Sequence, residues 1–527
     1  MKVYGMKREA LPERISSFAD EILEHCAKRR LGLKATLALF LPKAAAKLGA
    51  AAAAVWTLNE DLRHEVFSWQ TEPGFELDKE PYSVSVRISK GLRWITQPLD
   101  LDGKKVGTLA LGYKRAVKPD KNLPACLNAL AEELDNTLWN IHSAAVKQKL
   151  TEKVTHSLTR SVLSEALDEA VKALHEEIRF KNLAVVYRNE DAGESERVQY
   201  RVYRGKNCVN DSQKRPHKLL GKAVAREGLN ILIPERHIVR NLLGMKEGIT
   251  FMLSGQSAGA SRMGKIAVEV SGGLSTFGRD MMRIFANSVS QRLIDYNRER
   301  RHMAKFFAPK TVSELLSDPY YAKKYLSPRV KTLAILYSDI NSFTKICEKH
   351  LRRPDKIAEF VDRWSAGVVD IGWKRGGVFD KMVGDCVILL FGPPFFRLSP
   401  AECAREAALA AKEIQAFTVR MGRMPKYRGI GVKIKTKGMG VATGINLCPA
   451  ATGLFGPNQD FTAFSSGMNQ TARLQSKAGF RETLIMASGR EALLKAKLAK
   501  GLKFEGPYET EAKNVARPLK YYKVKYK

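Results

Sequence analysis

The stretch from Val330 to Gly392 constrains the fold most, because two acidic residues far apart in it are predicted to meet. It opens with an apolar run ending at Asp339, continues through a segment with apolar residues three and four apart, and closes with two apolar runs joined by Gly384-Asp385. This order predicts strand, helix, strand, turn and strand, the front of a ferredoxin-like unit. A right-handed crossover makes the first two strands parallel, and the third can lie between them, antiparallel to both. We therefore expect Asp339 to lie beside Asp385.

Two neighbouring carboxylates repel each other, so at neutral pH such a pair needs a cation or a shared proton. Oxygen ligands without His or Cys at matching places favour Mg²⁺ or Mn²⁺. Two such ions about 3.5–4 Å apart would stabilise the attacking and leaving oxygens in phosphoryl chemistry. Taken singly, each Asp could merely end a strand or fill a turn. Together with Phe343-Thr344, Lys381 and Gly384, the pair favours metal binding.

Two sequence blocks resemble the catalytic domain of class III nucleotidyl cyclases. The first joins Asp-Ile-Asn-Ser-Phe-Thr at 339–344 with Lys-Met-Val-Gly-Asp at 381–385, against the family's D-[IV]-x-x-[FY]-[TS] and K- or E-x-x-G-D. The second joins Asp-Phe-Thr at 460–462 with Asn-Gln-Thr-Ala-Arg-Leu at 469–474, against D-[YF]-T and N-x-x-x-R-[LM]. The similarity spans about residues 328–527, with the motifs in the family's order.

The resemblance assigns a role to each matched residue. It implies that Asp339 and Asp385 hold two Mg²⁺ or Mn²⁺ ions, with the Ile340 carbonyl as a further ligand. It also implies that Asn469 orients the ribose and that Arg473 stabilises the pentavalent phosphate. These last two residues are four apart, so on a helix they share one face.

Three further positions concern the nucleotide. Lys381 matches a purine-reading position where Lys goes with ATP and Glu with GTP, and Thr462 matches the second such position. The Lys–Thr pair resembles the bacterial class IIIb subgroup. Lys513 matches a phosphate-binding Lys, although the family's following Gly is Asn514 here.

The implied activity is conversion of ATP to cyclic AMP and pyrophosphate. In the family the metal-binding Asp residues come from one subunit and the Asn and Arg from the other. Because one chain carries all of them, a homodimer with two shared sites is expected. Two alternatives stay open: a guanylate cyclase, and a regulatory dimer that binds nucleotide without turning it over.

The first 300 residues suggest two copies of one module. Helix patterns over 14–48, strand patterns at 51–57 and 82–88, a hairpin at 99–113 and a long helix from 123 recur in similar order between 163 and 296, with a short strand expected at 231–233. This order is similar to tandem GAF domains.

The predicted chain is α+β, with GAF-like domains at 1–148 and 149–300, a helical linker at 301–327 and a cyclase domain at 328–527. An N-K-F-D-E signature is absent, so the modules' expected small-molecule ligand is unknown.

Composition limits the remaining possibilities. Seven scattered cysteines without a C-x-x-C pair argue for a reducing compartment and against a zinc site. No signal-peptide core opens the chain, and the apolar stretch 44–58 is too short to span a bilayer, so a cytoplasmic location is expected. The net charge of +33 would attract ATP and pyrophosphate or serve as a solubilising surface. Without a compact nucleic-acid motif, nucleic acid is not the expected partner.

Overall fold

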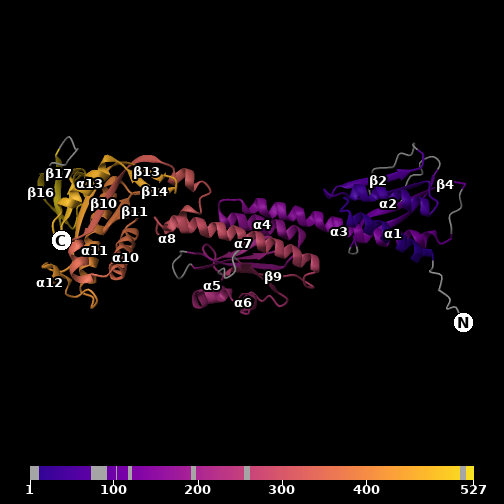
Figure 1. Ribbon diagram of the computed structural model, residues 1–527, viewed down its shortest axis with the longest axis horizontal. Helices are drawn as coiled ribbons and strands as arrows, with labels where there is room; N and C mark the ends of the chain where they lie inside the picture. The colour runs from indigo at the N-terminus through magenta and orange to yellow at the C-terminus, as the bar shows by residue number, and fades with distance from the viewer. Residues whose placement is uncertain are drawn as a thin grey trace. The chain divides into compact units, whose positions relative to one another are not determined.

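A computed structural model describes residues 11–72, 92–101, 104–116, 121–190, 197–254, 262–510 and 518–527 (Figure 1). The chain forms two compact units. One comprises Met1–His156, Ala170–Arg179 and Gly272–Ser288, and the other comprises Ser157–Glu169, Phe180–Ser271 and Val289–Lys527. Every helix in the described ranges is too short or too polar to cross a lipid bilayer.

The first sheet has four described strands in the order β2-β1-β4-β3, all antiparallel. Its elements are α1 (Leu11–Lys28), α2 (Leu33–Lys47), β1 (Ala52–Leu58), β2 (His64–Gln70), β3 (Leu92–Leu101), β4 (Lys104–Lys114) and α3 (Leu123–Leu158). Apolar stripes of α1, α2 and α3 bury against the sheet, with Leu37, Phe40 and Leu130 fully covered. The predicted helices and hairpin are confirmed. The strand predicted at 82–88 lies outside the described residues.

The second sheet has the order β7-β6-β5-β9-β8. Its elements are α4 (Leu163–Glu177), β5 (Asn182–Arg188), β6 (Val198–Arg204), β7 (Asn207–Asp211), α5 (Lys218–Glu227), η2 (Gly228–Leu232), α6 (Ile238–Leu242), β8 (Ile249–Ser254), β9 (Arg262–Glu269) and α7 (Thr276–Ala304). As in the first sheet, the first strand in sequence pairs with the second on one side and the last on the other. This shared topology agrees with the predicted repeat.

One predicted strand of this module is wrong. Residues 231–233 belong to the 3-10 helix η2 and the residues after it rather than to a strand. Gly228 ends α5 with a positive φ of 51°, and the chain turns at once into η2. Ile231 and Leu232 are buried in the core, which accounts for their apolar character. A run of three apolar residues is too short to show whether its period is that of a helix or of a strand.

Two of the predicted domain limits fall within long helices. The limit at 148/149 falls inside α3 and the limit at 300/301 inside α7. Continuous helices therefore cross both positions, and the exact limits stay a prediction.

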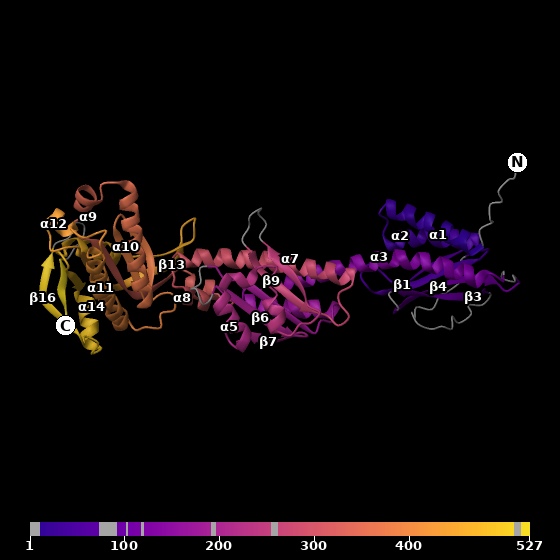
Figure 2. The ribbon, with the colours of Figure 1, turned by 90° about the horizontal axis from the view of Figure 1, so that it is seen from below.

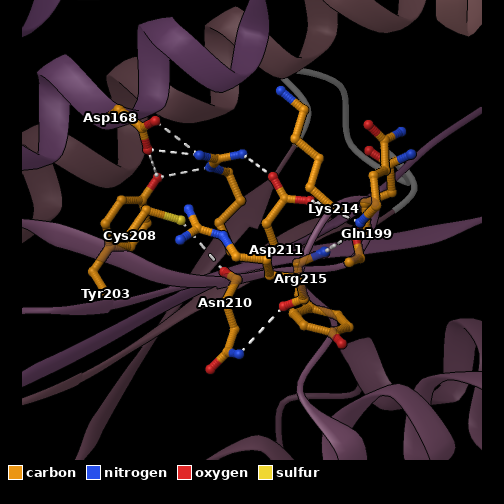
Figure 3. A network of polar contacts seen from close by, with 12 residues as sticks. Asp168, Gln199, Tyr203, Cys208, Asn210, Asp211, Lys214 and Arg215 are labelled. Carbon is orange, nitrogen blue, oxygen red and sulfur yellow. Dashed lines mark hydrogen bonds and ion pairs between the residues drawn. The ribbon is translucent and has the colours of Figure 1, made fainter.

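A buried ion network holds α4 against the second sheet (Figure 3). The Arg201 guanidinium, on β6, donates two 2.8 Å hydrogen bonds to the Asp168 carboxylate of α4 and another to Asp211 of β7. Its Nε donates to the Tyr203 hydroxyl, which in turn donates to Asp168. The Arg201 side chain is 8% exposed and that of Asp211 is 12% exposed, so these charges depend on each other rather than on water.

We expect Asp211→Asn to destabilise this module by about 3 kcal/mol, because it leaves a buried guanidinium short of countercharge. Hydrogen exchange of β5, β6 and β7 in the full chain measures this, and amides that open with the module should exchange about 100-fold faster. The control is Asp295→Asn, which removes an exposed 3.7 Å ion pair with Arg298 and should change exchange less than about threefold. Equal protection in both variants would contradict the prediction.

The last 200 residues build an eight-stranded sheet in the order β11-β12-β10-β13-β15-β17-β16, with β14 paired to β13. The elements are α8 (Pro309–Leu315), η3 (Ala322–Leu326), β10 (Arg329–Ile340), α9 (Phe343–Ile346), η4 (Cys347–Leu351), α10 (Pro354–Lys374), β11 (Gly377–Val383), β12 (Cys386–Phe391), α11 (Pro400–Gly422), α12 (Ile430–Ile434), β13 (Val441–Phe455), β14 (Asp460–Phe464), α13 (Ser466–Lys477), β15 (Thr483–Met486), α14 (Ala487–Lys495), β16 (Leu502–Thr510) and β17 (Leu519–Tyr526). β12 is antiparallel to both β10 and β11. The predicted order of strand, helix, strand, turn and strand is confirmed, with β12 between β10 and β11.

Helices α10 and α11 cover one face of this sheet (Figure 2). Alternate residues of β10, among them Ala334, Leu336 and Ile340, enter the core beneath them. The fully buried Trp364 donates a 2.9 Å hydrogen bond to the Thr418 hydroxyl and so joins the two helices. Because side chains alternate along a strand, Tyr337 and Asp339 point to the opposite face. That face is where the candidate site lies.

The sequence over 432–443 predicts a strand, and this prediction is wrong in its first half. Residues 430–434 form the short helix α12, and β13 begins at Val441. Ile430 and Ile434 are four apart and both buried, which is a helical spacing, while Val432 is exposed. The chain then turns through Lys435 and Gly438, both with positive φ. The alternation of apolar residues with lysines imitated a half-buried strand.

Candidate active site

Asp339 and Asp385 lie together, as the sequence predicted. Asp339 is the penultimate residue of β10, and Asp385 occupies the turn between β11 and β12. The pairing of Ser338 with Val387 brings the end of β10 beside the start of β12. The backbone N–H of Ile340 donates a 3.2 Å hydrogen bond to Asp385 Oδ2, which fixes the turn against the strand. The two carboxyl groups are hydrogen-bonded to each other.

Burial and mutual repulsion shape the electrostatics of this pair. Burial, followed by the charge of Asp385 and the hydrogen bond to it, raises the pKa of Asp339 to about 7. Burial also raises the pKa of Asp385. The raised values mean that the pair favours a shared proton or a cation near neutral pH. No group of three or more His, Cys, Asp or Glu side chains suited to a metal occurs in the described ranges.

This donor set fits Mg²⁺ or Mn²⁺. Two carboxylates provide hard oxygen ligands, and these ions commonly take their remaining ligands from water, backbone carbonyls and substrate phosphates. The side chain of Ile340 is buried in the core, so only its backbone could contribute. The residues present therefore suit an ion that is completed by its substrate.

A cavity of about 460 Å³ opens next to the acidic pair, a volume typical of small-molecule sites. Its walls come from β10, β11, β12, β14 and α13, and Lys381 and Asn469 both line it. Tyr337 and Cys386 also line it, two residues and one residue away from Asp339 and Asp385. The cavity and the carboxylates thus occupy adjoining parts of one face.

The other predicted site residues do not line this cavity or lie outside the described residues. Arg473 lies on α13 with Asn469, as predicted, but among the described residues it is not one that lines the cavity. Thr462, on β14, is 7% exposed and does not line the cavity either, although the next residue, Ala463, does. Lys513 lies outside the described residues.

Sequence reasoning missed several residues of this site. Gln475, three residues beyond the cavity-lining Ala472 on α13, lines the cavity and lies close enough to Asp339 to lower its pKa. Phe464 places its ring 5.9 Å from the Lys381 ammonium. Asp380, directly before Lys381, is buried. Gln475 follows Asn469 by two steps of three residues through Ala472, which is a helical spacing, but no sequence signal marks the other two.

The connector before β10 contacts the same strands. The carbonyl of Phe306 accepts a 2.9 Å hydrogen bond from the Phe379 N–H and a 3.1 Å bond from the Trp373 indole. The fully buried Phe307 packs edge-on against Phe461, with ring centroids 4.9 Å apart. Phe379 and Phe461 each lie within two residues of the predicted purine-reading positions.

No protein-family model matches the chain. It is 24% identical over 128 residues to the terminal-differentiation-specific adenylate cyclase of Dictyostelium discoideum, which covers 24% of this chain and 6% of that protein. It is also 24% identical over 195 residues to the uncharacterised protein Rv1318c of Mycobacterium tuberculosis, which covers 37% of this chain and 32% of that one. The chain thus spans a third or less of these curated relatives.

Solved structures similar to part of this chain include an adenylyl cyclase and a guanylyl cyclase. The adenylyl cyclase CyaB from P. aeruginosa is 24% identical, covers 38% of this chain and 97% of its own, and has a TM-score of 0.34. The guanylyl cyclase Cya2 is 20% identical, covers 37% and 93%, and has a TM-score of 0.32. Part of this chain is similar to adenylyl and guanylyl cyclases.

Proposed function

We propose that this chain is an adenylate cyclase that converts ATP to cyclic AMP and pyrophosphate at a homodimer interface. The observation that carries the proposal is the juxtaposition of Asp339 and Asp385 on one face of the sheet, beside a cavity. A pair of half-buried acids next to a nucleotide-sized cavity supports binding of a divalent cation and a triphosphate together. The sequence similarity to an adenylate cyclase agrees with it.

Each residue has a proposed role in the reaction. Asp339 and Asp385 would hold Mg²⁺ or Mn²⁺, whose chemistry is to lower the pKa of the ribose 3′-hydroxyl and to neutralise phosphate charge. Asn469 would orient the ribose by hydrogen bonds. Arg473 would meet charge that develops on the α-phosphate in the transition state, where an interaction raises the rate. Lys513 would bind phosphate.

The proposed dimer rests on the resemblance to class III cyclases, in which the metal-binding Asp residues and the Asn and Arg come from different subunits. Within one chain Arg473 does not join Asn469 among the described cavity-lining residues. In the proposed arrangement Asp339 and Asp385 of one subunit face Asn469 and Arg473 of the other. Two equivalent shared sites then form about a two-fold axis, as in any isologous dimer.

Base selection would depend on Lys381 and Thr462. A Lys ammonium has three donors and no acceptor, whereas a Thr hydroxyl can donate or accept. A donor at Lys381 suits N1 of adenine, which is an acceptor, and disfavours N1–H of guanine. The guanylate cyclase alternative is therefore less favoured by this pair.

Regulation by the N-terminal modules has a physical route through the connector. Phe306 and Phe307 anchor on Phe379 and Phe461, which lie next to the proposed base-reading positions. Two packed arrangements of this connector would displace β11 and β14 together and thereby change nucleotide binding. The two GAF-like modules, with an unidentified small molecule as ligand, are the proposed source of that change.

Purified full-length protein with Mn²⁺ and either ATP or GTP tests the proposal. We expect cyclic AMP from ATP, and turnover of GTP at least about tenfold lower, because a mismatched base leaves polar groups unpaired. Higher turnover of GTP would establish the guanylate cyclase alternative. Nucleotide binding without either product would establish the non-catalytic alternative.

A further inference from the structure

Asp380 is a buried carboxylate that the reaction scheme does not use. It lies on β11, where the pairing with β12 shifts between Phe379 and Lys381, so Asp380 is the extra residue of a bulge. Bulges re-aim the side chains around them. The Asp380 side chain is 0% exposed, while that of the next residue, Lys381, is 45% exposed and lines the cavity.

The groups around Asp380 provide its carboxylate with an incomplete set of hydrogen-bond partners. The Lys381 ammonium lies 3.8 Å from Oδ2, which is ion-pair range and not a hydrogen bond. The Thr462 hydroxyl and the Ala463 N–H face the carboxylate closely enough to lower its pKa, but burial outweighs them and the pKa is raised. Within the described chain, both Asp380 oxygens and Thr462 Oγ1 lack a partner at hydrogen-bond geometry.

A purely structural role explains this arrangement poorly. Buried polar groups in folded proteins are nearly always hydrogen-bonded, because an unpaired one costs stability. The Arg201 network of this same chain shows the usual outcome, since each of its carboxylates is hydrogen-bonded. Exceptions of this kind concentrate at functional sites.

Its position suggests what Asp380 does. It is the one carboxylate, among the described residues, within 4 Å of the Lys381 ammonium. Its charge also reaches Tyr337, which lines the same cavity, and contributes after burial to raising the pKa of that hydroxyl to about 12. An ionised carboxylate here draws the Thr462 O–H toward itself, because a carboxylate offers acceptors only.

We infer that Asp380 is a positioning residue that sets the hydrogen-bond polarity of the base-reading pair and thereby selects an aminopurine nucleotide. This inference rests on the proposed cyclase function. When the Thr462 hydroxyl donates to Asp380, its oxygen can offer a base only lone pairs, and Lys381 can offer only donors. An acceptor beside a donor matches the 6-amino group and N1 of adenine. The same pair opposes the 6-oxo group and N1–H of guanine.

The decisive variant is Asp380→Asn, which keeps the side-chain size and removes the charge. Its amide can donate to Thr462, so the hydroxyl is free to donate to a 6-oxo group. We expect KM for ATP to rise about tenfold and the ATP-to-GTP preference in kcat/KM to fall at least about tenfold, with kcat changing less. The melting temperature should stay level or rise, because an unpaired buried charge is removed.

Two comparisons separate positioning from a structural role. Asp370→Asn, which removes only an exposed 2.6 Å pair with Lys374 on α10, should leave the kinetics and base preference unchanged. Thr462→Val should lose base preference like Asp380→Asn, and the double variant should lose little more, because both act through one hydroxyl. If Asp380→Asn does not fold, the base preference of Thr462→Val still tests the inference. A wild-type preference in that variant would show that the Thr462 hydroxyl does not select the base.

The outcomes distinguish this inference from the proposed function. Equilibrium binding of non-hydrolysable ATP and GTP analogues provides a readout without turnover. Wild-type base preference in Asp380→Asn together with a lowered melting temperature would make Asp380 structural and overturn the inference, while cyclase activity would stand. Wild-type protein that neither binds nor converts either nucleotide would overturn the proposed function itself.

Discussion

Replacing Asp385 with asparagine should lower cyclic nucleotide formation by at least about 10³-fold, because the variant loses one of two carboxylates that hold the cation. Asp339→Asn should have an effect of the same size, since the two groups adjoin and are hydrogen-bonded to each other. Both changes keep the side-chain size, so the turn held by the Ile340 N–H can persist through the amide oxygen. The measurement is product formation from ATP with Mn²⁺.

Thermal unfolding gives this prediction a second readout that is independent of activity. Mn²⁺ should raise the melting temperature of the wild-type protein, since a ligand that binds only the folded state stabilises it, and should not raise that of Asp385→Asn. Without metal the variant should melt at or above the wild-type temperature, because two adjoining half-buried carboxylates no longer repel. Asp370→Asn serves as the matched surface control. An equal Mn²⁺ effect in Asp385→Asn and wild type would place the cation elsewhere.

Mixing two inactive variants should restore activity if the sites are shared between subunits. Asp385→Ala and Arg473→Ala are each expected to be inactive alone, because every site in either homodimer lacks one essential group. After exchange of subunits about half of the dimers are mixed, and each has one intact site, so roughly a quarter of the wild-type activity should return. Titration of one variant against the other, followed by cyclic AMP formation, measures this.

The control mixture combines Asp339→Ala with Asp385→Ala. Both lesions fall on the same half of the site, so no pairing of these chains produces an intact site and no activity should return. Recovery in this control would point to another origin of activity. Failure of the first mixture, with both chains folded and dimeric, would reject shared sites.

Much of the C-terminal fold could be predicted because its determinants are local. The apolar spacing of α10 and the apolar runs of β10, β11 and β12 each indicate one element. The handedness of crossovers then leaves few ways to arrange them, which is why the Asp339–Asp385 contact was predictable. The errors at 231–233 and 432–443 arose where short apolar segments fit two periodicities. Glycines with positive φ decided the outcome there.

The sequence by itself determined which residues carry charge, the helical register of Asn469 and Arg473, and the strand order that joins the two acids. Only the tertiary structure decided that Asp380 is buried while Lys381 is exposed, and that Thr462 turns toward Asp380. It also decided that Arg201 is hydrogen-bonded to two carboxylates from separate segments. The reason is physical. Periodicity along a chain reports which face of an element is buried, but burial of a charge depends on neighbours that only the folded chain brings near.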